Sequence, residues 1–141
     1  MDVYRTKARK IPGTEFREVK QIAFSILKKV AKKSKRLPYI RSAFFNKDKV
    51  FLSLFLHHLF EKKDWKDRTR RLQFFEASIE LTQKSKLNPS SIENPNRRSE
   101  ILHRFNGVTK DGEMFFVQIK EDKSSGKKYF ISCFPNEKAS R

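Results

Sequence analysis

The C-terminal third of the chain carries side chains that suit the cleavage of a phosphodiester bond. Arg104 and Lys120 are cations that can neutralise a phosphate and stabilise the charge that develops when it is attacked. Ser132 adds a hydroxyl close to the end of the chain. Cleavage of RNA by its own 2′-hydroxyl also needs a group that moves protons, and His58 and His103 are the candidates for this role. These residue types predict metal-independent cleavage of RNA.

Each of the two histidines has an alternative interpretation. His103 lies next to Arg104, yet strand alternation turns it towards the core, so a buried histidine and a catalytic histidine both stay open. His58 follows His57 in an apolar segment, and both lie within helical reach of Glu61, which also fits a solvated helix face. The sequence contains no HExxH, CxxC or phosphate-binding glycine-rich motif, so we expect neither a metal nor another cofactor.

Three short stretches of aromatic and β-branched residues predict the strands that hold these side chains. They span residues 100–106, 113–120 and 127–134, with turn signals between them. Pairing Lys120 with Lys128 across the second turn gives an apolar face for the core. The opposite, open face then has cations that alternate with aromatic rings, which suits binding of a single-stranded nucleic acid. The alternative interpretation of this face is a solvated surface with a small hydrophobic cluster. The predicted open face carries Arg104, Gln118, Lys120, Lys128, Ser132, Phe116, Phe130 and Phe134.

The segment before these strands has the period of amphipathic helices. Apolar residues recur at helical spacing over residues 15–33, 46–62 and 65–84, with Asn46 as the expected start of the second helix. Residues 84–96 are rich in Ser, Asn and Pro and predict a connecting loop. Helices followed by strands define an α+β fold, with about three N-terminal helices and then a curved antiparallel meander. We expect a flexible basic arm at residues 1–13 and a single domain at 14–141, helical over 14–87 and sheet-forming over 97–136.

The net charge of +17 indicates a polyanionic partner. Lys and Arg number 33 against 16 Asp and Glu, and residues 1–49 alone hold 15 basic and four acidic residues. Such an excess attracts phosphate backbones, so RNA is the expected partner. The alternative is a solvated basic surface without a specific partner. Further cations that we expect to contact nucleic acid are Lys35, Arg36, Arg41, Arg68 and Arg71.

The cysteine content and the hydropathy indicate the cytoplasm. Cys133 is the only cysteine, so it cannot form an internal disulfide, and we expect a reducing compartment. The sequence has no apolar run of about 18 residues, and residues 1–17 are too polar for a secretory signal. We therefore expect a cytoplasmic protein without a membrane partner.

Three strings in the C-terminal third carry a resemblance to a known group of proteins. They are RFNG at 104–107, FFVQIK at 115–120 and YFISCFP at 129–135. Together they resemble the end of the metal-independent ribonuclease toxin group that includes barnase, EndoU, colicin D and RelE, particularly its phage and mobile-element members. The resemblance implies helices before a curved antiparallel sheet, cleavage of transfer RNA or other cellular RNA, and an antitoxin or immunity protein as a partner. It supports catalytic roles for Arg104, Lys120 and Ser132, while the matching stretch lacks an acidic residue placed like the general base of barnase.

Three functions follow from these observations. The first is a metal-independent endoribonuclease of toxin or effector type, which cleaves RNA by attack of the 2′-hydroxyl. The second is a non-catalytic RNA- or DNA-binding module of a mobile element or phage. The third is a protein-interaction domain whose charge serves solubility or an acidic partner. Strong, salt-sensitive RNA binding separates the first two functions from the third.

Overall fold

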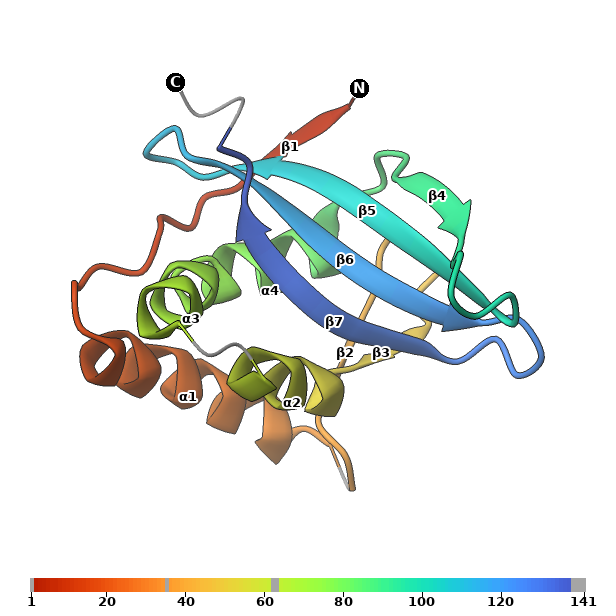
Figure 1. Cartoon of the computed structure of the whole chain (residues 1–141), viewed down its shortest axis with the longest axis horizontal. Coiled ribbons are helices and arrows are strands. Elements are labelled where there is room, and N and C mark those ends of the chain that lie inside the picture. Colours follow the sequence, from red (N-terminus) through yellow and green to blue (C-terminus); the bar gives the residue numbers. More distant parts are fainter. Residues whose placement is uncertain (1, 35, 62–63, 138–141) are drawn as a thin grey trace.

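Strands from the whole length of the chain form one curled sheet, and the helices pack against it (Figure 1). The computed structural model describes residues 2–34, 36–61 and 64–137. Its helices are α1 (Phe16–Lys32), α2 (Ser53–Glu61), α3 (Trp65–Leu72) and α4 (Phe75–Lys84). Its strands are β1 (Val3–Arg5), β2 (Tyr39–Arg41), β3 (Lys49–Phe51), β4 (Ser90–Glu93), β5 (Glu100–Val108), β6 (Met114–Asp122) and β7 (Lys128–Pro135).

The sheet is mixed. Its strand order is β1-β5-β6-β7-β3-β2, and β4 also pairs with β5. β5, β6 and β7 are antiparallel neighbours, as the two turn signals predict, but β1 runs parallel to β5 and β3 runs parallel to β7. The α+β prediction is therefore confirmed, and the prediction of a purely antiparallel meander is wrong. The missed strands, β1 to β4, have only three or four residues each, too few for a period-two pattern to stand out.

The register of β5, β6 and β7 decides which side chains share a face. Arg104 pairs with Gln118, and Gln118 pairs with Ser132, so these three residues lie on one face as expected. The predicted register places Phe105 beside Phe115, whereas Phe105 pairs with Val117 in the structure. This difference of two residues preserves the faces, because side chains alternate with a period of two.

A bulge in β7 changes the face of its first residues. The pairing shifts between Gln118 and Ile119, and Ile131 is the extra residue that has no partner. Before the bulge the alternation is reversed, so Phe130 pairs with Ile119 and Lys128 lies on the core side as well. The prediction that Phe130 and Lys128 lie on the open face is therefore wrong.

α1 begins and ends within one residue of the helix predicted over residues 15–33. The helices predicted over residues 46–62 and 65–84 differ from the structure. Asn46 and Lys47 have positive φ angles of 55° and 68° and form the turn between β2 and β3, so Asn46 caps no helix. Asparagine tolerates this left-handed conformation better than most residues. The expected helix over 65–84 is two helices, because the chain turns at residues 73–74. Asp64 caps α3 by accepting a hydrogen bond from the Lys66 amide at 2.9 Å.

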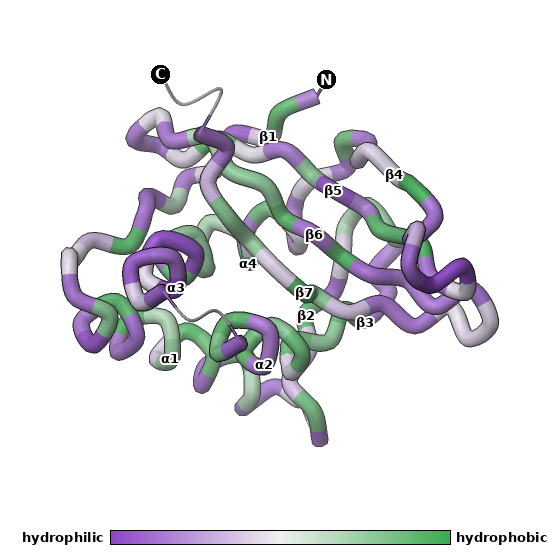
Figure 2. The backbone as a smooth tube through the Cα atoms, in the orientation of Figure 1, coloured by the Kyte–Doolittle hydropathy of each residue, from purple (hydrophilic) through white to green (hydrophobic). Residues whose placement is uncertain are grey.

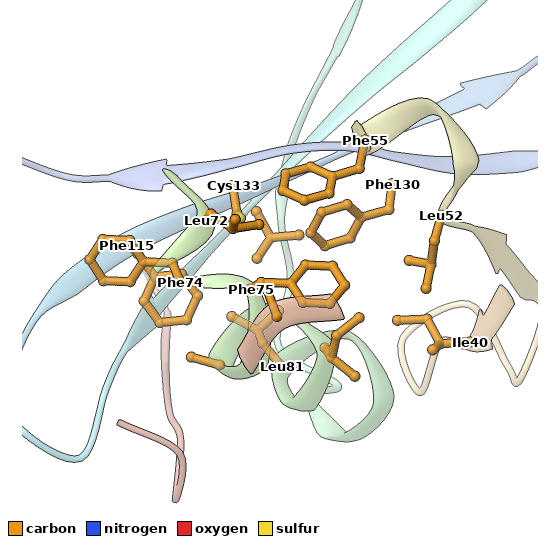
Figure 3. Close-up of a cluster of buried hydrophobic side chains, with 14 of the residues drawn as sticks. Ile40, Leu52, Phe55, Leu72, Phe74, Phe75, Leu81, Phe115, Phe130 and Cys133 are labelled. Atoms are coloured by element: carbon orange, nitrogen blue, oxygen red, sulfur yellow. The ribbon is translucent and has the colours of Figure 1, made fainter. Parts of the chain in front are cut away.

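Phenylalanine rings fill the core between the helices and the sheet (Figure 3). Phe55 of α2 stacks on Phe75 of α4 with ring centroids 5.3 Å apart, and Phe130 of β7 lies edge-on to Phe55 at 5.2 Å. Phe74 stacks on Phe115 of β6 at 5.4 Å. Figure 2 shows the alternation of hydrophobic and hydrophilic residues along β5, β6 and β7 that gives the sheet one buried face.

The N-terminal segment is part of the fold and not a flexible arm. Val3–Arg5 forms the parallel strand β1 on the edge of β5, and the Thr6 amide continues the pairing by donating to the Val108 carbonyl at 2.9 Å. Ile11 is 2% exposed and its amide donates to the Gln73 carbonyl. The expectation of a flexible arm was wrong because it rested on charge and on one Pro-Gly pair, while the strand partner lies about 100 residues away in the sequence.

No helix within the described part of the chain is both long enough and apolar enough to cross a membrane.

Candidate nucleic-acid interface

The open face of the sheet carries a cluster of five residues, Arg71, Arg104, Phe116, Ser132 and Phe134, which we call the arginine cluster. The guanidinium carbons of Arg71 and Arg104 lie 5.2 Å and 5.3 Å from the centroid of the Phe134 ring. Arg104 also lies 5.1 Å from the centroid of Phe116, whose ring is 5.4 Å from that of Phe134. Both guanidinium groups therefore make a cation–π contact with the same ring.

Arg71 reaches this face from α3 across a free edge of the sheet. β3 pairs with β7 only at Val50–Lys128 and Phe51–Tyr129. The C-terminal half of β7 therefore has no strand on the edge away from β6, and α3 packs against β7 there. Arg71 donates from Nη1 to Ser132 Oγ at 2.8 Å. Its Nε donates to Asp67 Oδ2, one helical turn earlier, at 3.0 Å. Both contacts fix the direction of the guanidinium group.

Arg104 lies on β5, next to the central strand β6, and is exposed. Its Nη2 donates to Gln118 Oε1 at 3.2 Å. Arg104 and Phe116 line a shallow hollow of about 420 Å³ together with Pro135, Asn136 and Glu137. Glu137 forms an ion pair with Arg70 of α3. The Glu137 carboxylate and the Arg104 guanidinium group therefore border the same hollow.

Lys120 lies on the same face, further along β6. Its Nζ is 3.2 Å from Glu100 Oε2 and 5.1 Å from the centroid of the Tyr129 ring. The ion pair offsets much of its positive charge, so Lys120 contributes less to the potential of this face than Arg104 does.

Lys128 and Phe130 belong to the structure of the protein and not to this interface. Phe130 is fully buried and cannot stack on a base. Lys128 is 6% exposed, and its Nζ donates to Asp48 Oδ2 and to the Gly126 carbonyl, both at 2.9 Å. Burial of this cation is balanced by these partners, so the expected contact of Lys128 with nucleic acid is wrong.

His103 faces the core, on the side opposite Arg104. Its Nδ1 is 2.7 Å from Ser91 Oγ, and its Nε2 is 2.8 Å from Glu121 Oε1. The ring also lies edge-on to Phe45 with centroids 4.9 Å apart. These contacts tie β4 to β6 through β5, which favours the structural interpretation of His103 over the catalytic one.

His58 lies on an outer face of α2. Its side chain is 45% exposed and its Nδ1 is 3.4 Å from Glu61 Oε2. His57 contacts the same carboxylate from Nε2 at 3.5 Å. The contacts of His58 are thus those of a solvated helix face, and the structure does not bring it into the arginine cluster.

The other predicted nucleic-acid contacts are spread over the surface. Arg68 stacks on Trp65 at 4.6 Å and on Phe60 at 5.5 Å at the junction of α2 and α3. Arg41 is exposed on β2, and Arg36 is exposed in the segment before it. Lys35 lies outside the described residues. Among the described members of this predicted group, Arg71 is the one that belongs to the arginine cluster.

Two features of the interface escape sequence reasoning. Glu137 lies beyond the last predicted strand, and nothing in the spacing of β7 links it to Arg104 or Arg70. Asp67 and Arg71 have the i,i+4 spacing of an ion pair on one helix face, so the sequence could have predicted that contact. The contact of Arg71 with Ser132 depends on how α3 packs against the sheet, which the spacing does not show. Among the described residues, no group of three or more His, Cys, Asp and Glu side chains is placed to hold a metal ion.

No protein-family model, curated protein or solved structure matches the chain. The resemblance to ribonuclease toxins therefore remains a prediction, and the functional argument depends on the geometry of the interface.

Proposed function

We propose that this protein is a metal-independent endoribonuclease that holds the scissile phosphate at the arginine cluster. The observation that carries the proposal is the position of Arg71 and Arg104 against the Phe134 ring of an otherwise open sheet face, with Ser132 hydrogen-bonded to Arg71. Two guanidinium groups can bind the non-bridging oxygens of one phosphate and stabilise the additional negative charge of its transition state. Phe116 and Phe134 offer ring surface for an adjacent base.

Ser132 is suited to contact a phosphate oxygen. Its Oγ accepts a hydrogen bond from Arg71, so the proton of the hydroxyl remains available for a third partner. A hydroxyl that accepts from a cation is a stronger donor than one in water. Ser132 therefore orients the phosphate between the two arginines and takes no proton itself.

Attack of the 2′-hydroxyl needs a proton acceptor, and the proposal assigns this role to Glu137. Its carboxylate lines the hollow that Arg104 and Phe116 also line, and a solvated glutamate is ionised at neutral pH. The 2′-oxygen forms a bond to phosphorus as its proton passes to Glu137, and the bond from phosphorus to the 5′-oxygen breaks. The leaving oxygen takes a proton from water, which gives a 2′,3′-cyclic phosphate and a 5′-hydroxyl.

The same cluster also fits the second function, a non-catalytic RNA-binding module, because the arginines and rings bind RNA whether or not a proton is moved. Transfer RNA as the substrate and an inhibitory antitoxin or immunity protein belong to the ribonuclease proposal and rest on the resemblance. The proposed cytoplasmic location rests on the single cysteine and the hydropathy of the sequence.

Incubation of the pure protein with total transfer RNA in EDTA separates the two functions. The proposal expects fragments with 2′,3′-cyclic ends from the wild type and from Lys110→Ala, which removes an exposed cation outside the cluster. It expects none from Arg104→Ala, and a loss of about 100-fold or more in rate from Glu137→Gln. RNA binding without any cleavage by the wild type would establish the binding module instead.

A further inference from the structure

A second strongly basic site lies at the edge strand β2, apart from the arginine cluster. It is a pocket of about 950 Å³ between the C-terminal ends of α1 and α4, the strand β2 and the turn that follows it. No acidic side chain of the described residues lines it. Six of its lining residues are exposed cations, namely Lys29, Lys33, Arg41, Lys47, Lys84 and Lys86.

The helix ends do not account for this charge. α1 ends at Lys32 and α4 ends at Lys84, so both helices direct their partly negative C-terminal ends at this region. Each helix end is equivalent to about half a negative charge, so the two together offset roughly one of the six cations. Within the described part of the chain, no carboxylate lies within ion-pair distance of any of the six. A pocket with an unbalanced charge of about +5 attracts an anion with several charges.

A row of aromatic rings connects this pocket to the open face. Tyr39 lines the pocket, and its ring lies 6.2 Å from that of Phe51, which in turn lies 5.9 Å from Tyr129. Tyr39 pairs with Phe51, Phe51 with Tyr129, and Tyr129 with Lys120, so all four side chains share the face of the arginine cluster.

Cations accompany the rings of this row. Lys49 Nζ lies 4.8 Å from the centroid of Tyr39, Arg41 lies 5.5 Å from it, and Lys120 lies 5.1 Å from Tyr129. Rings with adjacent cations are the surface on which the bases of a single strand stack while its phosphates are neutralised.

We propose that the pocket at β2 binds backbone phosphates of the same RNA strand whose scissile phosphate lies at the arginine cluster, with the intervening bases stacked along Tyr39, Phe51 and Tyr129. This inference rests on the proposed function for its ligand. β2 and β5 are four strand spacings apart, about 19 Å along the sheet at roughly 4.8 Å each. A strand that reaches from one site to the other falls within the roughly 4–16 nucleotides that single-strand binding surfaces cover.

The experiment compares two variants with the same loss of charge. The pocket variant carries Lys33→Gln, Lys47→Gln and Lys86→Gln. The control variant carries Lys66→Gln, Lys110→Gln and Lys127→Gln, three exposed lysines outside the pocket and the aromatic row. Binding is measured at several salt concentrations with a single-stranded 2′-O-methyl RNA of about 20 nucleotides, which has no free 2′-hydroxyl to attack. Cleavage is measured separately with a dinucleotide, which is too short to reach the pocket.

The pocket variant is expected to bind the long RNA at least tenfold more weakly than the control variant at moderate salt. Its salt slope is expected to fall by up to about 2, since each lost contact with a single strand contributes roughly 0.7. Tyr129→Ala is expected to weaken binding of the long RNA about tenfold. The pocket variant and the control variant are both expected to cleave the dinucleotide at the rate of the wild type.

Equal losses of affinity in the pocket and control variants would overturn the proposal, because they would show only a general effect of net charge. Failure of the ribonuclease proposal gives a different result, in which the dinucleotide stays intact with every protein while the pocket and control variants still differ in binding. An unchanged affinity of Tyr129→Ala would remove the connection between the two sites.

Discussion

Arg71 donates a 2.8 Å hydrogen bond to Ser132, a contact that joins α3 to the open face of β7 across 61 residues of sequence. It depends on the free edge of β7, since a strand paired there would stand between α3 and the open face. The Phe134 ring lies within cation–π distance of both guanidinium groups of the arginine cluster. The interface is thus assembled from one helix and three strands, α3, β5, β6 and β7, and each has to be in place for the cluster to form.

Ser132→Ala tests the contact directly. The change removes the acceptor of Arg71 and the hydroxyl that faces the phosphate, so RNA affinity is expected to fall about tenfold, the scale of one hydrogen bond with a charged partner. The free energy of unfolding should change by less than about 1 kcal/mol, because the site is partly exposed and Arg71 keeps Asp67. Ser25→Ala on the exposed face of α1 is the matched control. Unchanged RNA affinity in Ser132→Ala would argue against the cluster as the phosphate site.

His103→Leu separates the two interpretations of the buried histidine. The substitution leaves Ser91 and Glu121 without their hydrogen-bond partner, so we expect the free energy of unfolding to fall by about 1–3 kcal/mol. RNA binding and cleavage should persist at temperatures where the variant is folded. Urea unfolding followed by circular dichroism measures the first quantity. Lost cleavage with unchanged stability would instead identify His103 as catalytic.

The sequence predicted the central part of the fold well, because its signals are local. The alternation of aromatic and polar residues in β5 to β7 placed Arg104, Gln118 and Ser132 on one face, and Cys133 on the other, even though the register differed by two residues. An error of two residues changes the partners and leaves the faces intact. The bulge at Ile131 adds one residue and reverses the faces before it, which is why Phe130 and Lys128 were misplaced.

The remaining differences come from contacts between distant segments. β1 pairs with β5 about 100 residues later, and β3 pairs with β7 nearly 80 residues later. Neither strand is longer than three residues, so its own sequence carries little signal. The position of Glu137 beside Arg104 and the reach of Arg71 to Ser132 depend in the same way on packing that no local pattern encodes.

Removal of residues 2–13 is expected to destabilise the protein, whereas the flexible arm predicted from the sequence would be dispensable. Ile11 is fully enclosed, and β1 covers part of the edge of β5. Ile11→Ala alone should lower the free energy of unfolding by about 2–5 kcal/mol. Lys7→Gln together with Arg9→Gln removes two exposed charges of the same segment and serves as the control. Equal unfolding midpoints for Ile11→Ala and this control would contradict the packed N-terminus.

Cys133 gives the protein a predictable loss of stability at high pH. Its Sγ donates to the Arg71 carbonyl at 3.2 Å, and burial raises the pKa of the thiol from 9.0 to about 12. Between these two pH values the unfolded chain has lost the thiol proton while the folded chain keeps it. The unfolded state then binds fewer protons, so the free energy of unfolding falls as the pH rises through this window.

A comparison with Cys133→Ala isolates this effect from other groups. Burial and Glu80 raise the pKa of Tyr4, but Tyr4 is present in both proteins, so its contribution cancels in the comparison. Urea unfolding from about pH 8 to pH 11 should show a steeper loss of stability for the wild type than for Cys133→Ala. Parallel pH profiles would contradict the buried neutral thiol.

Modification by a thiol reagent gives a second measurement. Because the folded thiol stays protonated and enclosed, its modification at about pH 8 should proceed only as fast as the protein opens. Rapid modification of the folded protein would place Cys133 outside the core.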